Sequence, residues 1–315
     1  MEYDSGWVGA GETDDLDRAL LAEADNEPFD LTAPHVMTAL GPVDPPALGI
    51  TLGSSSWIGA DEPLGTLVDG PSLAAAELEL FHAAGGRAVL VAAIAGDEIS
   101  MDRAREVATR SPCHLVLTAN VDELGARVTV QLVETLAALV TPGRGPHRVR
   151  AGLLGIDCGD GRDGIATIDV ADAVAETHHL TGVPVLLRGR AAAVDDWFDR
   201  LTGAGVRPDR VVIALLHEED GEADRPFLDG GATLLIEREA GSGVTDGSLA
   251  TAISRRVADG FGSQLLLGDR SGHGWNDLLE RLPLTLMETG MDARQVRQLL
   301  VENPARALSI VKDER

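Results

Sequence analysis

The sequence predicts a (β/α)8 barrel, an α/β TIM-barrel fold, preceded by an acidic N-terminal extension. The chain has 315 residues, enough for one barrel of about 250 residues and an extension. Apolar segments alternate with longer amphipathic segments, and no low-complexity linker interrupts the alternation. The apolar segments are nearly continuous in Val, Leu and Ile, which is typical of parallel strands that are buried on both faces.

The predicted elements follow one another in strand–helix order. Two amphipathic segments predict helices: PSLAAAELELFHAAGG (71–86) and IDVADAVAETHHLTG (168–182), the second closed by a glycine. The predicted strands are 49–54, 88–94, 114–120, 150–157, 183–189, 210–216, 232–238 and 263–269. Eight strand–helix repeats of this kind are the pattern of the barrel.

Residues 1–34 form the predicted extension and residues 35–315 the predicted barrel. The extension contains GETDDLDRALLAEADNEPFD, which lacks the basic start and the apolar run of a signal peptide. The chain has no apolar run of about 18 residues, the length that a membrane-spanning helix needs. Cys113 and Cys158 fit a reducing compartment and do not have the spacing of a metal finger. We therefore expect a soluble, cytoplasmic protein.

The charge of the chain argues against two classes of partner. The formal net charge is −25, while 44% of the residues are hydrophobic, an ordinary value for a globular protein. The negative charge therefore belongs to the surface of a folded protein. Nucleic acids and anionic membranes both need a basic face, so neither is an expected partner.

Candidate functional residues stand where the predicted strands end. In this fold the active site lies at the carboxyl ends of the strands, because the loops that follow the strands converge there. The residues at these ends are Ser54, Ser56, Gly155, Asp157, Arg188, Arg190, Leu215, His217, Glu237, Glu239 and Asp269.

Several motifs carry a family resemblance over residues 36–311. They are VMTALGPVDPPALGITL, ELELFHAAGGRAVLV, VRAGLLGI, TGVPVLL, GVRPDRVVIALL and LMETGMDARQVRQLLVENPARALSI. The last is the most specific, because it contains the tetrapeptide NPAR at 303–306. In this order the motifs resemble the phosphotriesterase family of the amidohydrolase superfamily.

The resemblance implies a hydrolase whose two divalent metals activate a bridging hydroxide. This chain departs from the ligand set that the resemblance implies. Ser54 and Ser56 stand in place of the first two histidines, Gly155 in place of the bridging residue, and Arg188 and Leu215 in place of the two later histidines. Asp269 is the one ligand retained. Serine hydroxyls do not replace imidazoles as zinc ligands, and a guanidinium cannot bind a cation.

The leading prediction is therefore a pseudoenzyme without a metal cofactor. It would bind a small anionic ligand or a protein partner, as a homodimer or paired with an active paralogue. We expect Arg188 to replace the metal charge by an ion pair with Asp269. Arg188, Arg190 and Arg270 could instead bind an anion, or pair with acids such as Glu237 and Glu239.

The alternative prediction is an active hydrolase of esters, lactones or phosphoesters with relocated ligands. Asp157, His217, Asp269 and His273 would then hold one zinc or manganese ion. Convergence of these side chains to within about 2–2.5 Å of one point would support this alternative. The serines at 54–56 lack the GxSxG motif of a nucleophile.

Overall fold

The computed structural model describes residues 29–312 except 55–70, 95–97, 122–128, 160–163, 217–222, 240–244 and 271–273. Contacts divide the chain into two units, residues 1–33 and residues 34–315. The second unit contains all the helices and strands described below.

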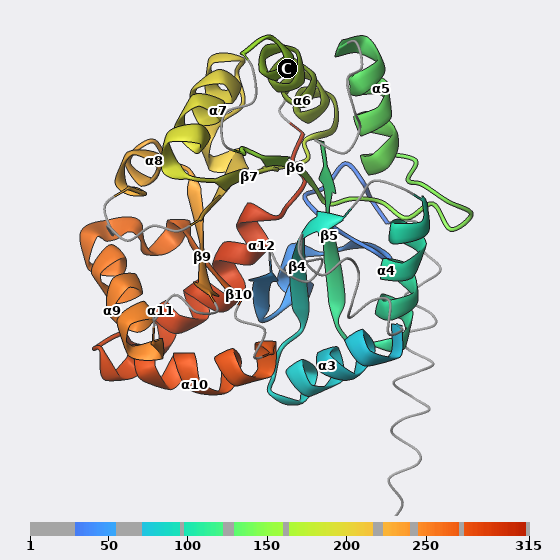
Figure 1. Ribbon diagram of the computed structural model, residues 1–315. Helices are drawn as coiled ribbons and strands as arrows, with labels where there is room; N and C mark the ends of the chain where they lie inside the picture. The colour runs from blue at the N-terminus through green and yellow to red at the C-terminus, as the bar shows by residue number, and fades with distance from the viewer. Residues whose placement is uncertain are drawn as a thin grey trace, which may run out of the picture. The chain divides into compact units, whose positions relative to one another are not determined.

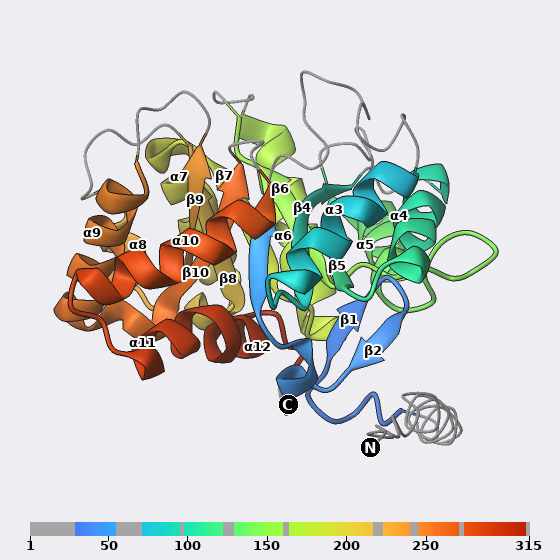
Figure 2. The same ribbon diagram turned by 90° about the horizontal axis from the view of Figure 1, so that it is seen from below.

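The predicted barrel is confirmed. Eight parallel strands form a closed barrel in chain order, and the last strand pairs with the first. Figure 1 views the barrel from one end and Figure 2 views it from the side. The strands are β3 (Thr51–Ser54), β4 (Ala88–Ile94), β5 (His114–Asn120), β6 (Leu153–Asp157), β7 (Val185–Gly189), β8 (Val211–Leu215), β9 (Thr233–Glu239) and β10 (Leu265–Arg270). Each matches a segment expected from the sequence to within three residues at either end.

Helices surround the strands (Figure 1). They are α3 (Pro71–Ala83), α4 (Glu98–Arg110), α5 (Thr129–Val140), α6 (Gly164–Thr181), α7 (Ala191–Gly203), α8 (Arg225–Asp229), α9 (Asp246–Arg256) and α10 (Trp275–Glu288). Short helices η3 (Pro208–Arg210), η4 (Val257–Phe261) and η5 (Gly262–Gln264) lie between them, and α11 (Ala293–Arg297), η6 (Gln298–Glu302) and α12 (Asn303–Ala307) follow. The helices expected at 71–86 and 168–182 are α3 and α6. None of the helices in the described part of the chain is both long enough and apolar enough to cross a membrane.

A hairpin and the last helix lie at the amino end of the barrel, opposite the direction of the strand arrows (Figure 2). The hairpin consists of β1 (Val36–Thr38) and β2 (Gly41–Val43), and the short helix η1 (Pro45–Leu48) follows it. The backbone N–H of Ala39 donates to the carbonyl of Leu115 on β5 over 2.8 Å. These elements were not expected from the sequence, because they are too short to show a periodic pattern.

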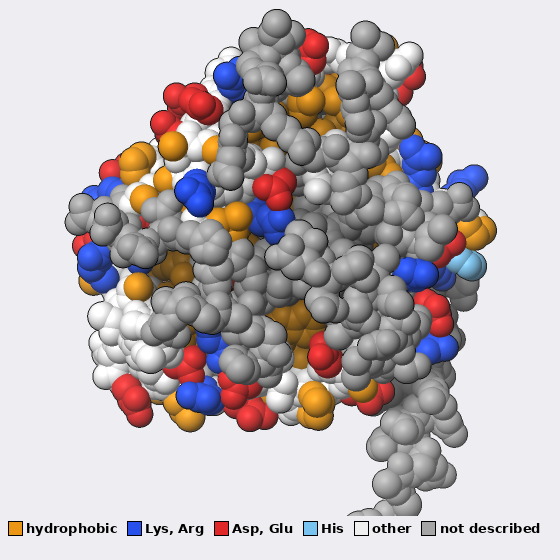
Figure 3. Space-filling model, in the orientation of Figure 1, with side chains coloured by type: hydrophobic (Ala, Val, Ile, Leu, Met, Phe, Trp, Pro, Cys, Tyr) orange, Lys and Arg blue, Asp and Glu red, His pale blue; other side chains and the backbone are white. Residues whose placement is uncertain are grey.

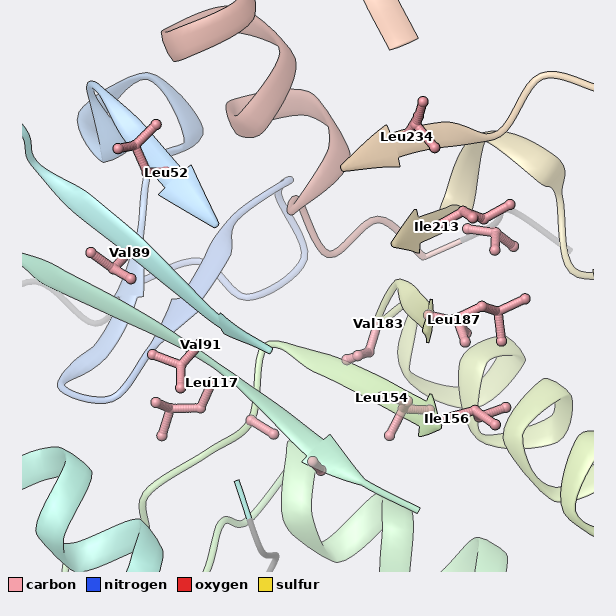
Figure 4. Close-up of a cluster of buried hydrophobic side chains, with 14 of the residues drawn as sticks. Leu52, Val89, Val91, Leu117, Leu154, Ile156, Val183, Leu187, Ile213 and Leu234 are labelled. Carbon is pink, nitrogen blue, oxygen red and sulfur yellow. The ribbon is translucent and has the colours of Figure 1, made fainter. Parts of the chain in front are cut away.

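The buried apolar side chains form two clusters, one on each face of the sheet. The interior cluster contains residues such as Val212 and Ala214 of β8, together with Leu308 from the C-terminal end. The outer cluster lies between the sheet and the helices and contains Val211 and Ile213 of the same strand. Figure 4 shows part of the outer cluster. Because successive side chains of a strand point to opposite faces, membership of a cluster identifies which residues face the barrel interior.

Candidate functional site at the carboxyl ends of the strands

Glycines bring the strands β3, β9 and β10 close together inside the barrel. A Cβ atom at Gly268 of β10 would lie 2.7 Å from the carbonyl oxygen of Gly53 and 3.0 Å from Cγ of Glu237. A Cβ atom at Gly53 of β3 would lie 2.6 Å from Leu235, a member of the interior cluster. Gly53, Glu237 and Gly268 therefore face the interior, and the chain packs too tightly here for a side chain at either glycine.

An acid and an arginine form an ion pair between β6 and β7, at the end of the barrel where the carboxyl ends of the strands lie. We call this end the mouth. Asp157 and Arg188 are direct neighbours in the register of these strands, and Nη2 of Arg188 donates to Oδ2 of Asp157 over 2.5 Å. Leu186, two residues before Arg188, belongs to the interior cluster, so Arg188 faces the same side. The side chains of Arg188 and Asp157 are 19% and 36% exposed. In Figure 3, which views this end, a basic and an acidic side chain lie together near the middle of the face.

Asp269 lies on the other face of the sheet. Its side chain is 3% exposed and accepts a hydrogen bond of 2.9 Å from Nε of Arg238. The two residues are register neighbours on β10 and β9. Because Gly268 and Glu237 face the interior, the residues that follow them, Asp269 and Arg238, face the helices. The expected ion pair between Arg188 and Asp269 is therefore wrong, since their side chains point to opposite faces of the barrel wall.

Arg238 connects the sheet to the first turns of two helices. Its Nη1 lies 2.7 Å from Oδ2 of Asp277 in α10 and 3.4 Å from Oδ1 of Asp246 in α9. Nη2 of Arg281 approaches Asp246 from the surface, at 2.9 Å. One buried guanidinium thus holds three carboxylates from three different elements. We call Arg238, Asp246, Asp269 and Asp277 the Arg238 network.

The contacts within the Arg238 network favour the charged forms of Arg238 and Asp277. Burial alone would lower the pKa of Arg238, but hydrogen bonds to Asp269 and Asp277 outweigh burial and raise the pKa above its ordinary value. The hydrogen bond from Arg238 also lowers the pKa of Asp277. A metal ion that took Asp269 from this network would remove one of the carboxylates that balance the buried charge of Arg238.

The remaining candidate residues from the sequence are spread over different surroundings. Leu215 packs against the outer cluster, whereas Ala214 before it belongs to the interior cluster. Gly155 is buried in β6. Arg190 is exposed and directly precedes α7. Ser56, His217 and His273, and the side chains of Ser54, Glu239 and Arg270, lie outside the described residues.

The two described members of the relocated metal site do not converge. Asp157 pairs with Arg188 at the mouth, whereas Asp269 pairs with Arg238 on the face of the sheet that the helices cover. Within the described part of the chain, no group of three His, Cys, Asp or Glu residues is placed to hold a metal ion. His217 and His273 lie outside it.

Four of the six positions at which the resemblance implies metal ligands do not fit a pair of divalent metals: Gly155, Arg188, Leu215 and Asp269. Gly155 offers no donor atom, and the side chain of Leu215 is a hydrocarbon. Arg188 is a cation, which repels metal ions. The carboxylate of Asp269 is turned away from the interior and held by Arg238. No step of a metal-dependent reaction can therefore be assigned to these positions.

Arg238 is the residue that reasoning from the sequence missed. The acids Glu237 and Glu239 were selected from β9, and the arginine between them was not. One signal was present: Arg188 follows Asp157 by 31 residues, and Asp269 follows Arg238 by the same interval. Such an interval is one strand–helix repeat, so it places two opposite charges at matching levels of adjacent strands.

Two solved structures share this architecture. A lactonase from Listeria monocytogenes matches with a TM-score of 0.76 and 17% sequence identity, over 88% of this chain and 100% of its own. An amidohydrolase from Mycoplasma synoviae matches with a TM-score of 0.75 and 19% identity, over 90% of this chain and 94% of its own. The chain has the fold of these two proteins. No protein-family model and no curated protein matches the sequence.

Proposed function

We propose that this chain is a pseudoenzyme: a barrel of hydrolase fold that binds a ligand at its mouth and does not perform metal-dependent hydrolysis. The observation that carries the proposal is the ion pair between Arg188 and Asp157. A divalent cation at this position would have to displace a guanidinium from its carboxylate and then remain beside it. Both changes oppose metal binding, because like charges at short range repel strongly where water is partly excluded.

The direction of Asp269 supports the same proposal. This residue is the one acid that the family resemblance retains, and it is engaged with Arg238 on the helix side of the sheet. Bringing it to the mouth would leave Arg238 buried without one of its carboxylates, at a cost of several kcal/mol. Neither the phosphotriesterase-like ligand set nor its relocated form is favoured.

We propose a small anionic ligand for the mouth. Arg188 is a fixed positive charge in a protein of formal net charge −25, and guanidinium groups bind carboxylates and phosphates in bidentate geometry. Arg190 lies two residues further along the chain and is exposed. An anion that contacts Arg188 would share it with Asp157, so we expect weak binding that depends on ionic strength.

Metal analysis tests the loss of hydrolysis. The protein is incubated with zinc, manganese or cobalt, dialysed, and measured by elemental analysis, then assayed with lactones, aryl esters and phosphotriesters. We expect no metal above background and no turnover. Stoichiometric metal that disappears in both Asp157→Ala and His217→Ala, together with hydrolysis, would overturn the proposal.

Ligand-dependent melting tests the binding site. Phosphate and citrate are added to the wild type, to Arg188→Gln and to Arg207→Gln, a matched control whose exposed arginine pairs with Asp209. A ligand that binds only the native state raises the melting temperature by mass action. We expect the increase to be lost in Arg188→Gln and kept in Arg207→Gln. Equal increases in all three proteins would rule out the mouth as the anion site.

A further inference from the structure

The connection between α5 and β6 is a long loop at the end of the barrel opposite the mouth. It runs from residue 141 to residue 152, whereas connections from a helix to the next strand usually have about two to six residues. Figure 2 shows it as a light-green loop that projects from the body of the molecule. We call residues 141–150 the basic loop.

The basic loop is opposite in charge to the chain as a whole. It reads TPGRGPHRVR, with three arginines, one histidine and no acid, in a chain with 51 acidic and 26 basic residues. Arg144, His147 and Arg148 are exposed, and Arg150 is half-buried. Four basic side chains are thus concentrated within one segment of ten residues on an otherwise acidic protein.

The arginines of the basic loop lie apart from the acids that the structure describes. Several exposed arginines elsewhere contact acids: Arg110 pairs with Glu106, Arg207 with Asp209, and Arg297 with Glu302. Within the described part of the chain, no carboxylate lies within 4.0 Å of the guanidinium groups of the basic loop. Among the described residues, therefore, no acid neutralises the three guanidinium groups of the basic loop.

The backbone holds the loop in a defined shape. The N–H of Arg144 donates to the carbonyl of Val149 over 2.8 Å, and the N–H of Val149 donates back over 2.9 Å. Val149 is buried, which anchors the second limb. A Cβ atom at Gly143 would lie 2.2 Å from the carbonyl oxygen of Arg148, so the two limbs touch closely. The arginines are therefore presented by a preformed scaffold.

Arg148 adds an independent sign of function. Its φ is 51°, and no other non-glycine residue in the described part of the chain has a positive φ. A left-handed conformation costs a residue with a Cβ atom about 1–2 kcal/mol. Such strain tends to occur where a side chain has a role in binding or catalysis. Glycine or asparagine would adopt this conformation at lower cost, yet the position carries an arginine.

We propose that the basic loop is a docking surface for an acidic polypeptide segment of a partner protein. Each guanidinium can bind one carboxylate in bidentate geometry, and the preformed loop lowers the entropic cost of association. Nucleic acid does not fit, because its dense phosphates are repelled by the net charge of the protein while only three arginines attract them. The surface lies opposite the mouth, so this proposal does not depend on the proposed function.

Fluorescence anisotropy with an acidic peptide tests the proposal. The probe is a fluorescein-labelled peptide of alternating glutamate and serine, and a lysine–serine peptide of equal length is the probe control. The loop variant is Arg144→Gln/Arg148→Asn/Arg150→Gln, in which asparagine tolerates the left-handed backbone. The control variant is Arg110→Gln/Arg207→Gln/Arg297→Gln. It removes the same charge from arginines that already have acidic partners.

We expect the wild type to bind the acidic peptide at low ionic strength and to release it as salt is added. The loop variant should bind about tenfold more weakly, the sum of three exposed charge pairs, and the control variant should bind within about twofold of the wild type. Three results would overturn the proposal: no binding by the wild type, an equal loss in the control variant, or tighter binding of duplex DNA than of the peptide. If the loop variant does not melt as a folded protein, Arg144→Gln and Arg150→Gln are measured singly, and each should weaken binding.

Discussion

The molecule contains two ion pairs between an aspartate and an arginine, one partly exposed and one buried. Asp157 and Arg188 are register neighbours on β6 and β7, and Arg238 and Asp269 are register neighbours on β9 and β10. The first pair faces the barrel mouth and is partly exposed, whereas the second faces the helices and is almost completely buried. The face of the strand, and not the residue types, decides which pair belongs to a candidate ligand site and which holds the fold together.

The energetic roles of the two pairs should differ accordingly. A partly exposed pair contributes little to stability, because water solvates each partner well when the other is removed. A buried pair contributes little over an apolar replacement, yet removing one partner is costly because a charge is left buried. The following predictions test this contrast, from the largest expected effect to the smallest.

Arg238→Met should destabilise the protein by about 3–5 kcal/mol, because it removes the buried cation that balances the carboxylate of Asp269. The free energy of unfolding is measured by urea denaturation. The double variant Arg238→Met/Asp269→Leu should recover a large part of the loss, since it removes both buried charges. If Arg238→Met lowered the free energy of unfolding no more than Arg188→Met does, the proposed difference between the buried and the exposed pair would be wrong.

Gly268→Ala should destabilise by about 1–3 kcal/mol through overpacking. Its Cβ atom would lie 2.7 Å from the carbonyl oxygen of Gly53, a backbone atom that cannot rotate away. Gly159→Ala is the control, since nothing lies within 4 Å of its Cβ position, and should change stability by less than about 0.5 kcal/mol. Equal melting temperatures for the two variants would contradict the interior orientation of Gly268.

Asp277→Asn should cost about 1 kcal/mol at neutral pH, through loss of a hydrogen bond with a charged partner. The pKa of Asp277 is lowered from 3.8 by Arg238. A lowered pKa in the folded state contributes stability above the unfolded pKa and loses it as the pH falls through the folded pKa. The difference between wild type and variant should therefore shrink below about pH 4. A difference that stays constant with pH would exclude an ionised Asp277 as the source.

Arg188→Met should change the free energy of unfolding by at most about 1 kcal/mol, because its pair with Asp157 is partly exposed. The change should become smaller as salt is added, since exposed charges are screened. Denaturation at low and high ionic strength measures both effects. A larger loss that salt does not alter would show that the pair at the mouth is a structural element like the Arg238 network.

Reasoning from the sequence located the strands because each is a continuous apolar run, and it located the last helices through their motif. The structure explains NPAR physically. The Asn303 side-chain amide donates to the carbonyls of Gly262 and Leu265, over 2.8 Å each. It thereby attaches the C-terminal helices to the start of β10. Pro304 lies in the first turn of α12, where a backbone N–H would have no acceptor within the helix, so the N–H that proline lacks is not missed.

The same reasoning could not place Asp269 and Arg238. In a strand with one exposed face, alternation of apolar and polar residues shows which side each residue takes. The barrel strands are apolar on both faces, as the two buried clusters show, so alternation carries no such information. Asp157 and Arg188 were both recognised as candidates, but their pairing with each other was not.

The amino-acid sequence by itself determined the barrel, the order of its strands and the acidity of its surface, because these depend on local apolar patterns and on composition. Only the tertiary structure decided which charges meet. Closure of the barrel fixes the register between neighbouring strands, and the register sets both the level and the face of each side chain. One aspartate was thereby placed at the mouth with Arg188, and another was buried against Arg238.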